Sequence, residues 1–425
     1  MGKTDIAWEI LFDRHKILKE IERIGFFEIS AKDIKVEREP RLMAKFDHYS
    51  NLPKVFKENG LSILPISRSS YVIGDFDVYQ DVIYDKKAKP IPVEFPSGLT
   101  SIDPANLYSE SSALHSAHVT GMIDDILGER SYQTISGRMS SKEFDFNIRT
   151  RRGRDHSLTI KNAQVEIDGG YESDHQFMIV EAKNEKVDDF LVRQLYYPFR
   201  LWQGKTSKPV RPVFFTYSND IFSFFIYEFT DSDRYNSIKL LEQRDYMIAQ
   251  EGIHDDDIKK IYHSVIIVPE RAIPFPQADS FPRIVDLLGL LVDSDLSRND
   301  ITTNYDFDER QTNYYTTAGM YLGLIDKYTV DKNVMFTLSN LGKDIMKQKT
   351  KEKYLNLVRA ILAHETFNQV LGEYFQKGVL PDRSRVIEIM KNSKLYNVNS
   401  ESTYIRRSST VISWINWILE LPNTY

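Results

Sequence analysis

The sequence contains no cysteine, and this absence excludes disulfide bonds, thiolate zinc sites and a cysteine nucleophile. It also lacks an apolar run of the length that a membrane-spanning helix needs, and its first residues, MGKTDIAWEI, lack the apolar core of a secretion signal. No G-x-x-x-x-G-K-[ST] phosphate loop occurs, so ATP hydrolysis is not expected. We therefore expect a cytoplasmic protein that has no membrane partner and does not use ATP.

The composition is typical of a folded protein with more than one domain. The 425 residues are 41% hydrophobic and 27% charged, with a formal net charge of −6. This length exceeds what one hydrophobic core usually serves, and the balance of apolar and charged residues is typical of globular chains. A negative net charge does not exclude nucleic acid as a partner, because binding needs only a local basic surface.

Local patterns divide the chain into three regions. Residues 1–60 predict an N-terminal helical region of two helices and a loop. The first helical pattern ends at Gly25. Residues 61–275 are rich in β-branched and aromatic residues, and we expect strands there together with one long helix over about residues 111–127. Prolines mark a linker before the mostly helical residues 276–425.

The N-terminal region also contains a group of basic residues. They lie close together in sequence in the segment VEREPRLMAKFDH: Arg38, Arg41, Lys45 and His48. These side chains either contact DNA or form the outer face of a small helical cap, and the pattern leaves both interpretations open.

The segment from Val165 to Trp202 carries the strongest chemical signal. Its FMIVEAK stretch predicts a buried strand, on which Glu181 and Lys183 share one face. An acid and a base at the end of a core strand are costly to bury unless they bind something. Together with Asp168, which precedes an expected Gly-Gly turn, they would suit a hard divalent cation such as Mg²⁺. Such an ion activates water and stabilises charge on a phosphate.

Other assignments of these carboxylates remain open. Glu166 lies two residues before Asp168 on the same strand face and is a rival ligand, although Asp168 is favoured because it adjoins the expected turn. Glu110, at the start of the preceding helix, is a further candidate. Alternatively, Glu181 and Lys183 form an ordinary solvated pair on a hairpin.

The spacing D168-x12-E181-A182-K183, followed by a helix with QLYY, resembles the PD-(D/E)XK nuclease superfamily, and the wider chain resembles the type II restriction endonucleases within it. The resemblance implies an α/β (α+β, mixed-sheet) core of the restriction-endonuclease kind over residues 61–275. Ile167 stands where the family pattern has a proline.

The resemblance also implies a role for each site residue. Asp168 and Glu181 would ligate Mg²⁺, with the backbone carbonyl of Ala182 as a further ligand. Lys183 would orient or help to deprotonate the attacking water and offset charge near the scissile phosphate. Gln194 would face the site from the following helix.

A basic segment precedes this motif. IRTRRGRDH places four arginines in a turn-like link between strands: Arg149, Arg151, Arg152 and Arg154. Such a loop is suited to contacts with backbone phosphates, although a solvated surface loop would have the same composition.

The C-terminal region predicts a DNA-reading module. SFPRIVDLLGLLVD and DFDERQTNYYTTAGMYLGLID predict helices, and KYTVDKNVMFTLS predicts a short hairpin. Helices followed by a two-stranded wing form the winged-helix arrangement, whose last helix can enter the major groove. The residues in position to contact DNA from that helix are Arg310, Gln311, Asn313 and Tyr314.

A second, weaker copy of this module is expected before the end of the chain. The segment SESTYIRRSSTVISWINWILEL begins with polar residues that include Arg406 and Arg407 and ends in an apolar stretch. Residues 276–425 would then form tandem winged-helix or helix-turn-helix-like units. The alternative is a purely helical packing domain, and Trp414 and Trp417 are expected in the core in either case.

The resemblance, together with these patterns, implies a Mg²⁺-dependent, site-specific type II restriction endonuclease that hydrolyses double-stranded DNA and leaves 5′-phosphate ends. Double-strand cleavage needs two active sites, so we expect a homodimer, at least transiently. A cognate DNA methyltransferase on a separate chain would protect the host DNA. The alternatives are a methylation-dependent, repair or transposition nuclease on the same core, a DNA-binding regulator with an inactive nuclease fold, and an interaction protein with tandem winged helices.

Overall fold

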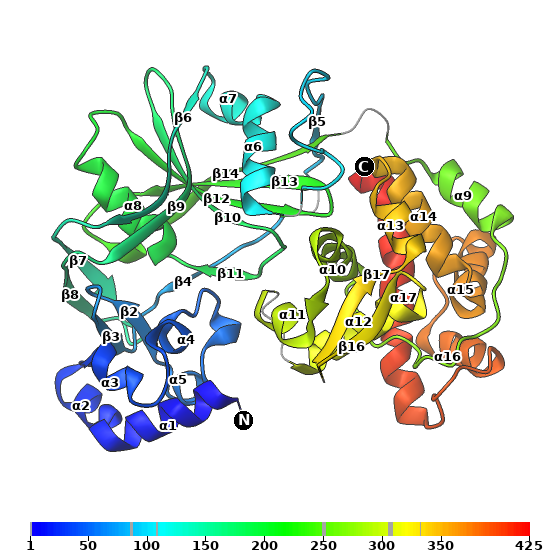
Figure 1. The fold of residues 1–425 in the computed structure, drawn as a ribbon, viewed down its shortest axis with the longest axis horizontal. Coiled ribbons are helices and arrows are strands. Elements are labelled where there is room, and N and C mark those ends of the chain that lie inside the picture. Colours follow the sequence, from blue (N-terminus) through cyan, green and yellow to red (C-terminus); the bar gives the residue numbers. More distant parts are fainter. Residues whose placement is uncertain (1, 86–87, 108, 249–251, 305–308, 332) are drawn as a thin grey trace. The chain divides into compact units, whose positions relative to one another are not determined.

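The computed structural model describes residues 2–85, 88–107, 109–248, 252–304, 309–331 and 333–425. Backbone contacts divide the chain into two compact units, each drawn in Figure 1. The first unit comprises residues 1–87, 121–216 and 223–244, and the second comprises residues 88–120, 217–222 and 245–425. None of the helices in these described segments is both long and apolar enough to cross a membrane.

Helices surround a small antiparallel sheet, ordered β1-β3-β2, at the start of the first unit. Its elements are α1 (Lys3–His15), α2 (Ile17–Ile24), β1 (Phe26–Ser30), α3 (Ala31–Lys35), α4 (Pro40–Ala44), η1 (Tyr49–Asn51), α5 (Lys54–Asn59), β2 (Ser62–Pro65) and β3 (Ser70–Gly74). The rings of Trp8 and Phe56 pack edge to face at 4.9 Å between α1 and α5. The prediction of only two helices and a loop over residues 1–60 is therefore wrong. Lys16, with φ 51°, separates the first two helices.

A mixed seven-stranded sheet follows, with the order β5-β14-β13-β12-β10-β9-β6. Its strands are β5 (Ile91–Val93), β6 (Tyr132–Ser140), β9 (Gln164–Glu172), β10 (Phe177–Lys183), β12 (Val210–Ser218), β13 (Ile221–Phe229) and β14 (Ile238–Ile248). Strand β10 runs parallel to β12 and antiparallel to β9. This confirms the expected mixed α/β architecture.

Helix α8 (Arg193–Gln203) connects the parallel strands β10 and β12 (Figure 1), as a parallel pair requires a crossover connection. Its Leu195 and Tyr196 pack in one core with Phe177 and Ile179 of β10. Because side chains alternate along a strand, Glu181 continues this row towards the face that α8 covers. The crossover therefore places the start of α8 beside the end of β10.

Short elements complete this part of the chain. They are β4 (Tyr79–Asp81), which pairs with β11 (Asp189–Leu191), the hairpin β7 (Phe144–Arg149) and β8 (Asp155–Ile160), and η2 (Tyr235–Ser237). The single long helix expected over residues 111–127 is instead two, α6 (Glu110–Val119) and α7 (Met122–Leu127). Gly121, with φ 81°, breaks the helix because glycine adopts the left-handed region at little cost.

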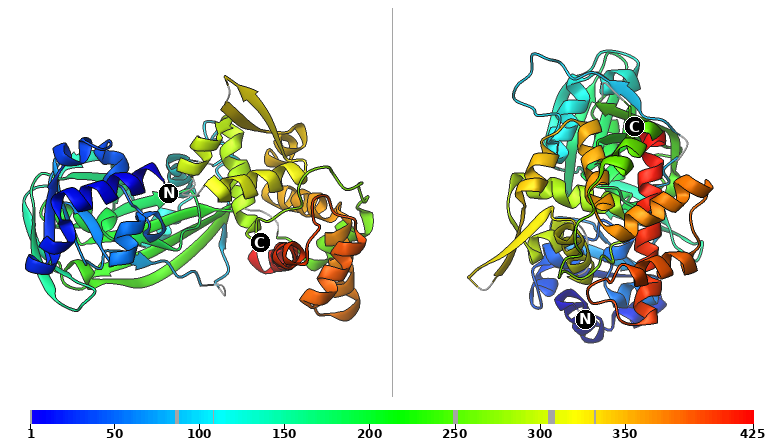
Figure 2. Two further views of the ribbon diagram at one scale, coloured as in Figure 1. Left: turned by 90° about the horizontal axis from the view of Figure 1, so that it is seen from below. Right: turned by 90° about the vertical axis from the view of Figure 1, so that its right-hand side faces the viewer.

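The second unit is mostly helical and includes a three-stranded sheet ordered β15-β17-β16. Besides β5 and α6, which fall within its residues 88–120, its elements are α9 (Asp255–Ser264), α10 (Phe281–Asp293), β15 (Leu296–Ser297), α11 (Arg298–Asn304), α12 (Glu309–Tyr321), β16 (Ile325–Val330), β17 (Asn333–Leu338), α13 (Asn340–Met346), α14 (Thr350–Leu362), α15 (Glu365–Lys377), α16 (Arg383–Asn392) and α17 (Glu401–Thr424). The hairpin β16–β17 projects from the helices of its unit (Figure 2). The predicted helices and hairpin are confirmed, although the middle of the hairpin tip, Lys332, lies outside the described residues.

The expected second copy of this arrangement has no wing. Residues 340–425 are all described and contain helices but no strand. Trp414 is completely buried, as expected, and its indole N–H donates to the carbonyl of Ala278 at 2.8 Å. Trp417 is only half-buried and packs on Phe281 at 4.1 Å. The apolar tail of α17 therefore serves helix packing.

The turn between β12 and β13 belongs to the second unit, where a buried ion pair holds it. Asn219 and Asp220 have φ 53° and 59°, which is the backbone of a two-residue hairpin turn with both central residues left-handed. Lys353 Nζ of α14 lies 2.6 Å from Asp220 Oδ2, and their side chains are only 1% and 9% exposed. The Tyr217 hydroxyl also donates to Asp220 Oδ1 at 3.0 Å.

Replacing Lys353 with Met is expected to destabilise the second unit by about 3–5 kcal/mol, because the Asp220 carboxylate would stay buried without its counter-charge. Urea unfolding followed by tryptophan fluorescence would measure the loss. Adding Asp220→Asn should recover much of it, since Asn tolerates the left-handed backbone. The control Lys259→Met breaks an exposed 3.4 Å contact with Asp256 and should cost less than about 1 kcal/mol. An unchanged midpoint for Lys353→Met would contradict the role of the pair.

Candidate active site

Asp168 and Glu181 lie where the adjoining strands β9 and β10 separate. The ladder between these strands ends at the pair Val180 and Gly169. The next backbone donor, the N–H of Ala182, bonds the carboxylate Oδ2 of Asp168 at 2.8 Å. A side chain thus replaces the backbone acceptor of the neighbouring strand. The N–H and C=O of one residue point to the same edge of a strand, so the carbonyl of Ala182 also faces this gap.

A β-bulge in β9 sets the direction of Asp168. In the ladder with β6, Gly137 pairs with Ile167 and Ile135 pairs with Gly170. Two residues of β9, Asp168 and Gly169, therefore stand opposite a single residue of β6. Bulges bend a strand and re-aim its side chains, and they are frequent beside active sites.

The Gly-Gly turn expected after Asp168 is not formed. Gly169 and Gly170 lie inside β9, and both positions are too crowded for a side chain. A Cβ at Gly169 would lie 2.7 Å from the ring of Tyr171, and one at Gly170 would lie 3.1 Å from Cβ of Ile135. These glycines permit close packing. The turn comes later, where the N–H of Ser173 donates to the carbonyl of Gln176 at 3.0 Å.

Glu181 is the centre of a buried polar network. Its side chain is 8% exposed, and its Oε1 accepts from Lys183 Nζ at 2.6 Å and from the amide Nε2 of Gln194. The expected position of Gln194 on α8, facing the site, is thus confirmed. Among the described residues, no donor contacts Oε2 of Glu181 or Oδ1 of Asp168, so one oxygen of each carboxylate is available to a ligand.

Burial controls the protonation of both carboxyl groups. It raises the pKa of Glu181 to about 8, with the Lys183 ammonium opposing the rise and the negative charge of Asp168 adding to it. Burial also raises the pKa of Asp168, opposed by the N–H of Ala182 and by Lys183. Glu181 is therefore the group expected to give up a proton when a cation binds.

Asp47 joins this site from the N-terminal part of the chain and was missed by the sequence patterns. Its backbone carbonyl accepts from the N–H of Leu191 at 2.9 Å, which ties it to the strand just before α8. Burial favours a higher pKa for Asp47, but the charges of Lys183, Lys45 and Arg193 outweigh it and lower the pKa. Its Oδ1 is buried without a hydrogen-bond partner. The sequence patterns pointed only to its neighbours Lys45 and His48, as basic residues that could contact DNA.

The donor set fits a hard divalent cation that keeps several water ligands. Asp168, Glu181 and the carbonyl of Ala182 offer the oxygen ligands that Mg²⁺ prefers. No group of three or more His, Asp or Glu side chains in the described part of the chain is arranged to hold a metal. Main-chain and water oxygens would therefore complete the coordination, as Mg²⁺ commonly requires.

The two rival carboxylates differ from Asp168 in what they contact or in the unit to which they belong. Glu166 is exposed and accepts from Arg138 Nε at 2.9 Å across the β6–β9 pair. Glu110 is the first residue of α6, in the second unit. Asp168, and not Glu166, bonds the backbone of β10, which favours it as the ligand.

The predicted basic link is the tip of the β7–β8 hairpin. A tight turn forms it, in which the N–H of Thr150 donates to the carbonyl of Arg154 at 2.7 Å and Gly153 has φ 79°. The four arginines are all exposed: Arg149, Arg151, Arg152 and Arg154. The guanidinium of Arg151 lies 5.4 Å from the ring centre of Tyr49. This cation–π contact favours one position of the Arg151 side chain.

The predicted contact residues of the second unit lie on α12 and α17. Arg310 is exposed and its Nε donates to the Tyr314 hydroxyl at 2.6 Å. Asn313 is exposed and Gln311 is half-buried. On α17, Arg406 is exposed, whereas burial lowers the pKa of Arg407, with Tyr314 opposing this shift. The structure therefore brings Arg407 close to Tyr314.

Comparison with known proteins matches the chain only to domains of unknown function. They are DUF6996 over residues 5–73, DUF6997 over residues 74–247 and DUF7226 over residues 283–423. The second match contains Asp168, Glu181, Lys183 and Gln194, and the first contains Asp47. No curated protein and no solved structure matches the chain.

The raised pKa of Glu181 predicts a pH dependence that metal binding should reverse. The ordinary value is 4.5 and the folded value is about 8, so between them the folded protein keeps a proton that the unfolded chain has lost. Metal-free stability should therefore fall as the pH rises through this window. Mg²⁺ binding at pH 7 should release up to about one proton per ion.

Calorimetry of Mg²⁺ binding in buffers of different ionisation enthalpy would count these protons, and thermal unfolding would follow stability. Glu181→Gln should weaken Mg²⁺ binding and flatten the pH dependence. The control Glu166→Gln removes an exposed carboxylate of the neighbouring strand β9 and should leave both unchanged. Mg²⁺ binding without proton release in the original protein would contradict the assignment.

Proposed function

We propose that the protein is a Mg²⁺-dependent, site-specific DNA endonuclease of the PD-(D/E)XK kind. The observation that carries this proposal is the convergence of Asp168, Glu181 and Lys183 at the point where β9 and β10 separate, fixed by the 2.8 Å bond from Ala182 to Asp168. Burying two acids and a lysine is costly, and a site that binds a cation and a phosphate would offset that cost.

Each residue has a distinct task in this proposal. A bound Mg²⁺ would supply an activated water and stabilise negative charge on the scissile phosphate. Asp168 and Glu181 would hold the ion through the oxygens that lack protein donors, and Gln194 would fix the orientation of Glu181. Lys183, whose side chain is 15% exposed, would donate hydrogen bonds to the attacking water and attract the phosphate.

DNA contact would come from exposed cations and from the second unit. We infer a winged-helix module from the element order α10, β15, α11, α12, β16, β17 and the sheet order β15-β17-β16. In such a module α12 would enter the major groove. Arg310, held by Tyr314, is suited to a bidentate contact with a base edge.

The proposed biological setting follows from this chemistry. A site-specific nuclease of the type II restriction kind would need a DNA methyltransferase partner to protect host DNA, and it would cut both strands as an at least transient homodimer.

Purified protein is expected to cut phage DNA into discrete bands with Mg²⁺ but not with EDTA. Lys183→Met should lower cleavage by at least about a hundredfold while DNA binding persists, because the substitution removes a charge used in the reaction. The control Lys239→Met removes a lysine that is 65% exposed in the same unit and should cut normally. Parallel reactions on methylated and unmethylated DNA decide whether methylation is required. Intact DNA in every reaction, together with a clear gel shift, would leave a DNA-binding protein and end the nuclease proposal.

The arginine hairpin is expected to contact phosphates without reading sequence. The double variant Arg151→Gln, Arg152→Gln should flatten the dependence of log K on log salt by about 0.9 per arginine. Gel shifts with EDTA at several salt concentrations would measure this slope for two unrelated duplexes. Arg211→Gln on β12 of the same unit is the matched control. A slope identical to that of the original protein would place the hairpin away from DNA.

A further inference from the structure

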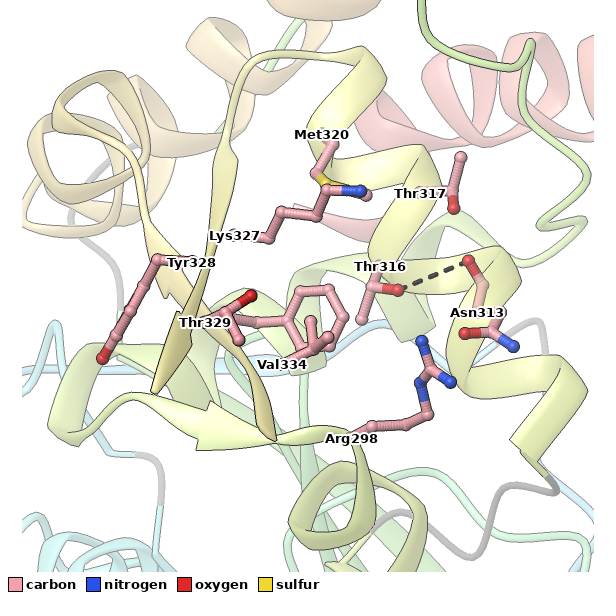
Figure 3. A pocket seen from close by; sticks show the side chains of 10 residues that line it. Arg298, Asn313, Thr316, Thr317, Met320, Lys327, Tyr328, Thr329 and Val334 are labelled. Carbon is pink, nitrogen blue, oxygen red and sulfur yellow. Dashed lines mark hydrogen bonds between the residues drawn. The ribbon is translucent and has the colours of Figure 1, made fainter. Parts of the chain in front are cut away.

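A pocket of about 320 Å³ lies between α12 and the β16–β17 hairpin of the second unit (Figure 3). This volume is at the lower end of the range for small-molecule sites, ~300–1,000 Å³. Its lining comes from α11, α12 and both strands of the hairpin.

Two cations mark opposite ends of this pocket. Figure 3 shows Arg298 reaching towards Thr316 and Asn313, while Lys327 extends on the other side towards Met320. Neither cation forms an ion pair with any described residue, and no acidic residue is among the ten that line the pocket. The pocket therefore has positive charge at both ends and nothing of its own to neutralise it.

The floor between the cations is apolar. In the hairpin register, Lys327 pairs with Phe336 and Thr329 pairs with Val334, and directly opposed residues share a sheet face. Phe336 is buried and Val334 half-buried, whereas the ring of Tyr328 projects to the other side of the strand (Figure 3). A flat, weakly polar group would rest against this floor.

The polar side chains on α12 can form hydrogen bonds with the edge of such a flat group. Thr316 Oγ1 already donates to the carbonyl of Thr312 at 2.8 Å, so towards the pocket its hydroxyl can only accept. Asn313 is exposed and carries both a donor and an acceptor on one planar amide. An amide of this kind can make paired hydrogen bonds with the edge of a nucleobase.

We propose that this pocket binds a single nucleotide with a phosphate on both its 5′ and its 3′ side. Arg298 contacts one phosphate through its planar fork and Lys327 contacts the other as a point charge. The base lies on Phe336 and Val334, and Asn313 bonds its edge. The separation of the two cations by an apolar floor matches this alternation of phosphate, base and phosphate.

Such a nucleotide has two sources. It is either a free nucleoside 3′,5′-bisphosphate or a nucleotide turned out of the stack of a bound duplex. The second source rests on the proposed function, since it requires that the second unit binds DNA. The first source does not depend on DNA binding.

Fluorescence titration of Lys183→Met protein without divalent metal tests the pocket independently of cleavage. The probes are deoxynucleoside 3′,5′-bisphosphates, the corresponding nucleosides, inorganic phosphate and a duplex that contains 2-aminopurine. Arg298→Gln and Lys327→Gln should each weaken bisphosphate binding at least about tenfold, the usual effect of losing a charged hydrogen bond. Lys347→Gln, an exposed lysine of the same unit outside the pocket, should have no effect.

The variant Thr317→Phe fills the pocket with a bulky side chain and leaves both cations in place. It therefore tests the space of the pocket separately from its charge. It should abolish bisphosphate binding, and it should abolish any rise in 2-aminopurine fluorescence while the gel shift of the duplex persists. Free bisphosphate binding supports the first source, and a 2-aminopurine signal alone supports the second.

Three results would overturn the proposal. One is the absence of both signals in Lys183→Met protein that carries no further substitution. Another is inorganic phosphate competing as well as the bisphosphate, which would reduce the pocket to a simple anion site. The third is bisphosphate binding that is unchanged in Arg298→Gln and in Lys327→Gln. These two variants are sufficient to test the proposal if Thr317→Phe does not fold. Nucleotide binding together with uncut DNA in the cleavage assay would instead contradict only the endonuclease proposal.

Discussion

The bond from the backbone N–H of Ala182 to the carboxylate of Asp168 is the contact on which the candidate site depends. It ends the β9–β10 ladder with a side chain in place of a backbone acceptor. An unpaired backbone donor at this depth would be costly, so Asp168 contributes to folding as well as to the site. The bulge in β9 and the close packing at Gly169 both serve to place this one carboxylate.

Burial, and not this bond, raises the pKa values of the two acids. Asp168 gains a hydrogen bond yet its pKa is raised, because burial outweighs that bond. Glu181 is more deeply affected, although Lys183 and Gln194 both donate to it. An arrangement selected for stability alone would favour apolar residues of similar size. The proposed binding of a cation would offset the cost of retaining three ionisable groups here.

Periodicity predicted the strand FMIVEAK, whereas the resemblance to the PD-(D/E)XK superfamily implied the mixed sheet, the following helix and the placement of Asp168 near Glu181. They did not predict Asp47, because it reaches the site through a loop that is tied to Leu191 by a single backbone bond, and such long-range contacts leave no periodic signal. They also misassigned Gly169 and Gly170 to a turn. Paired glycines indicate either a turn or close packing, and only the neighbouring Tyr171 ring decides between them.

The distribution of cations supports a division of labour within the chain. Lys353 is buried and Lys183 half-buried, and each is paired with a carboxylate, so they contribute little to the outer electrostatic field. The arginines of the β7–β8 hairpin are exposed and only partly neutralised; Arg152, for example, lies 3.6 Å from Asp75 and remains 81% exposed. In the proposed complex with DNA, the net charge of −6 would oppose binding overall, and the local cations would determine which surface approaches the phosphate backbone. In the proposed complex, this pattern would orient the acidic chain on DNA rather than raise its overall affinity for DNA.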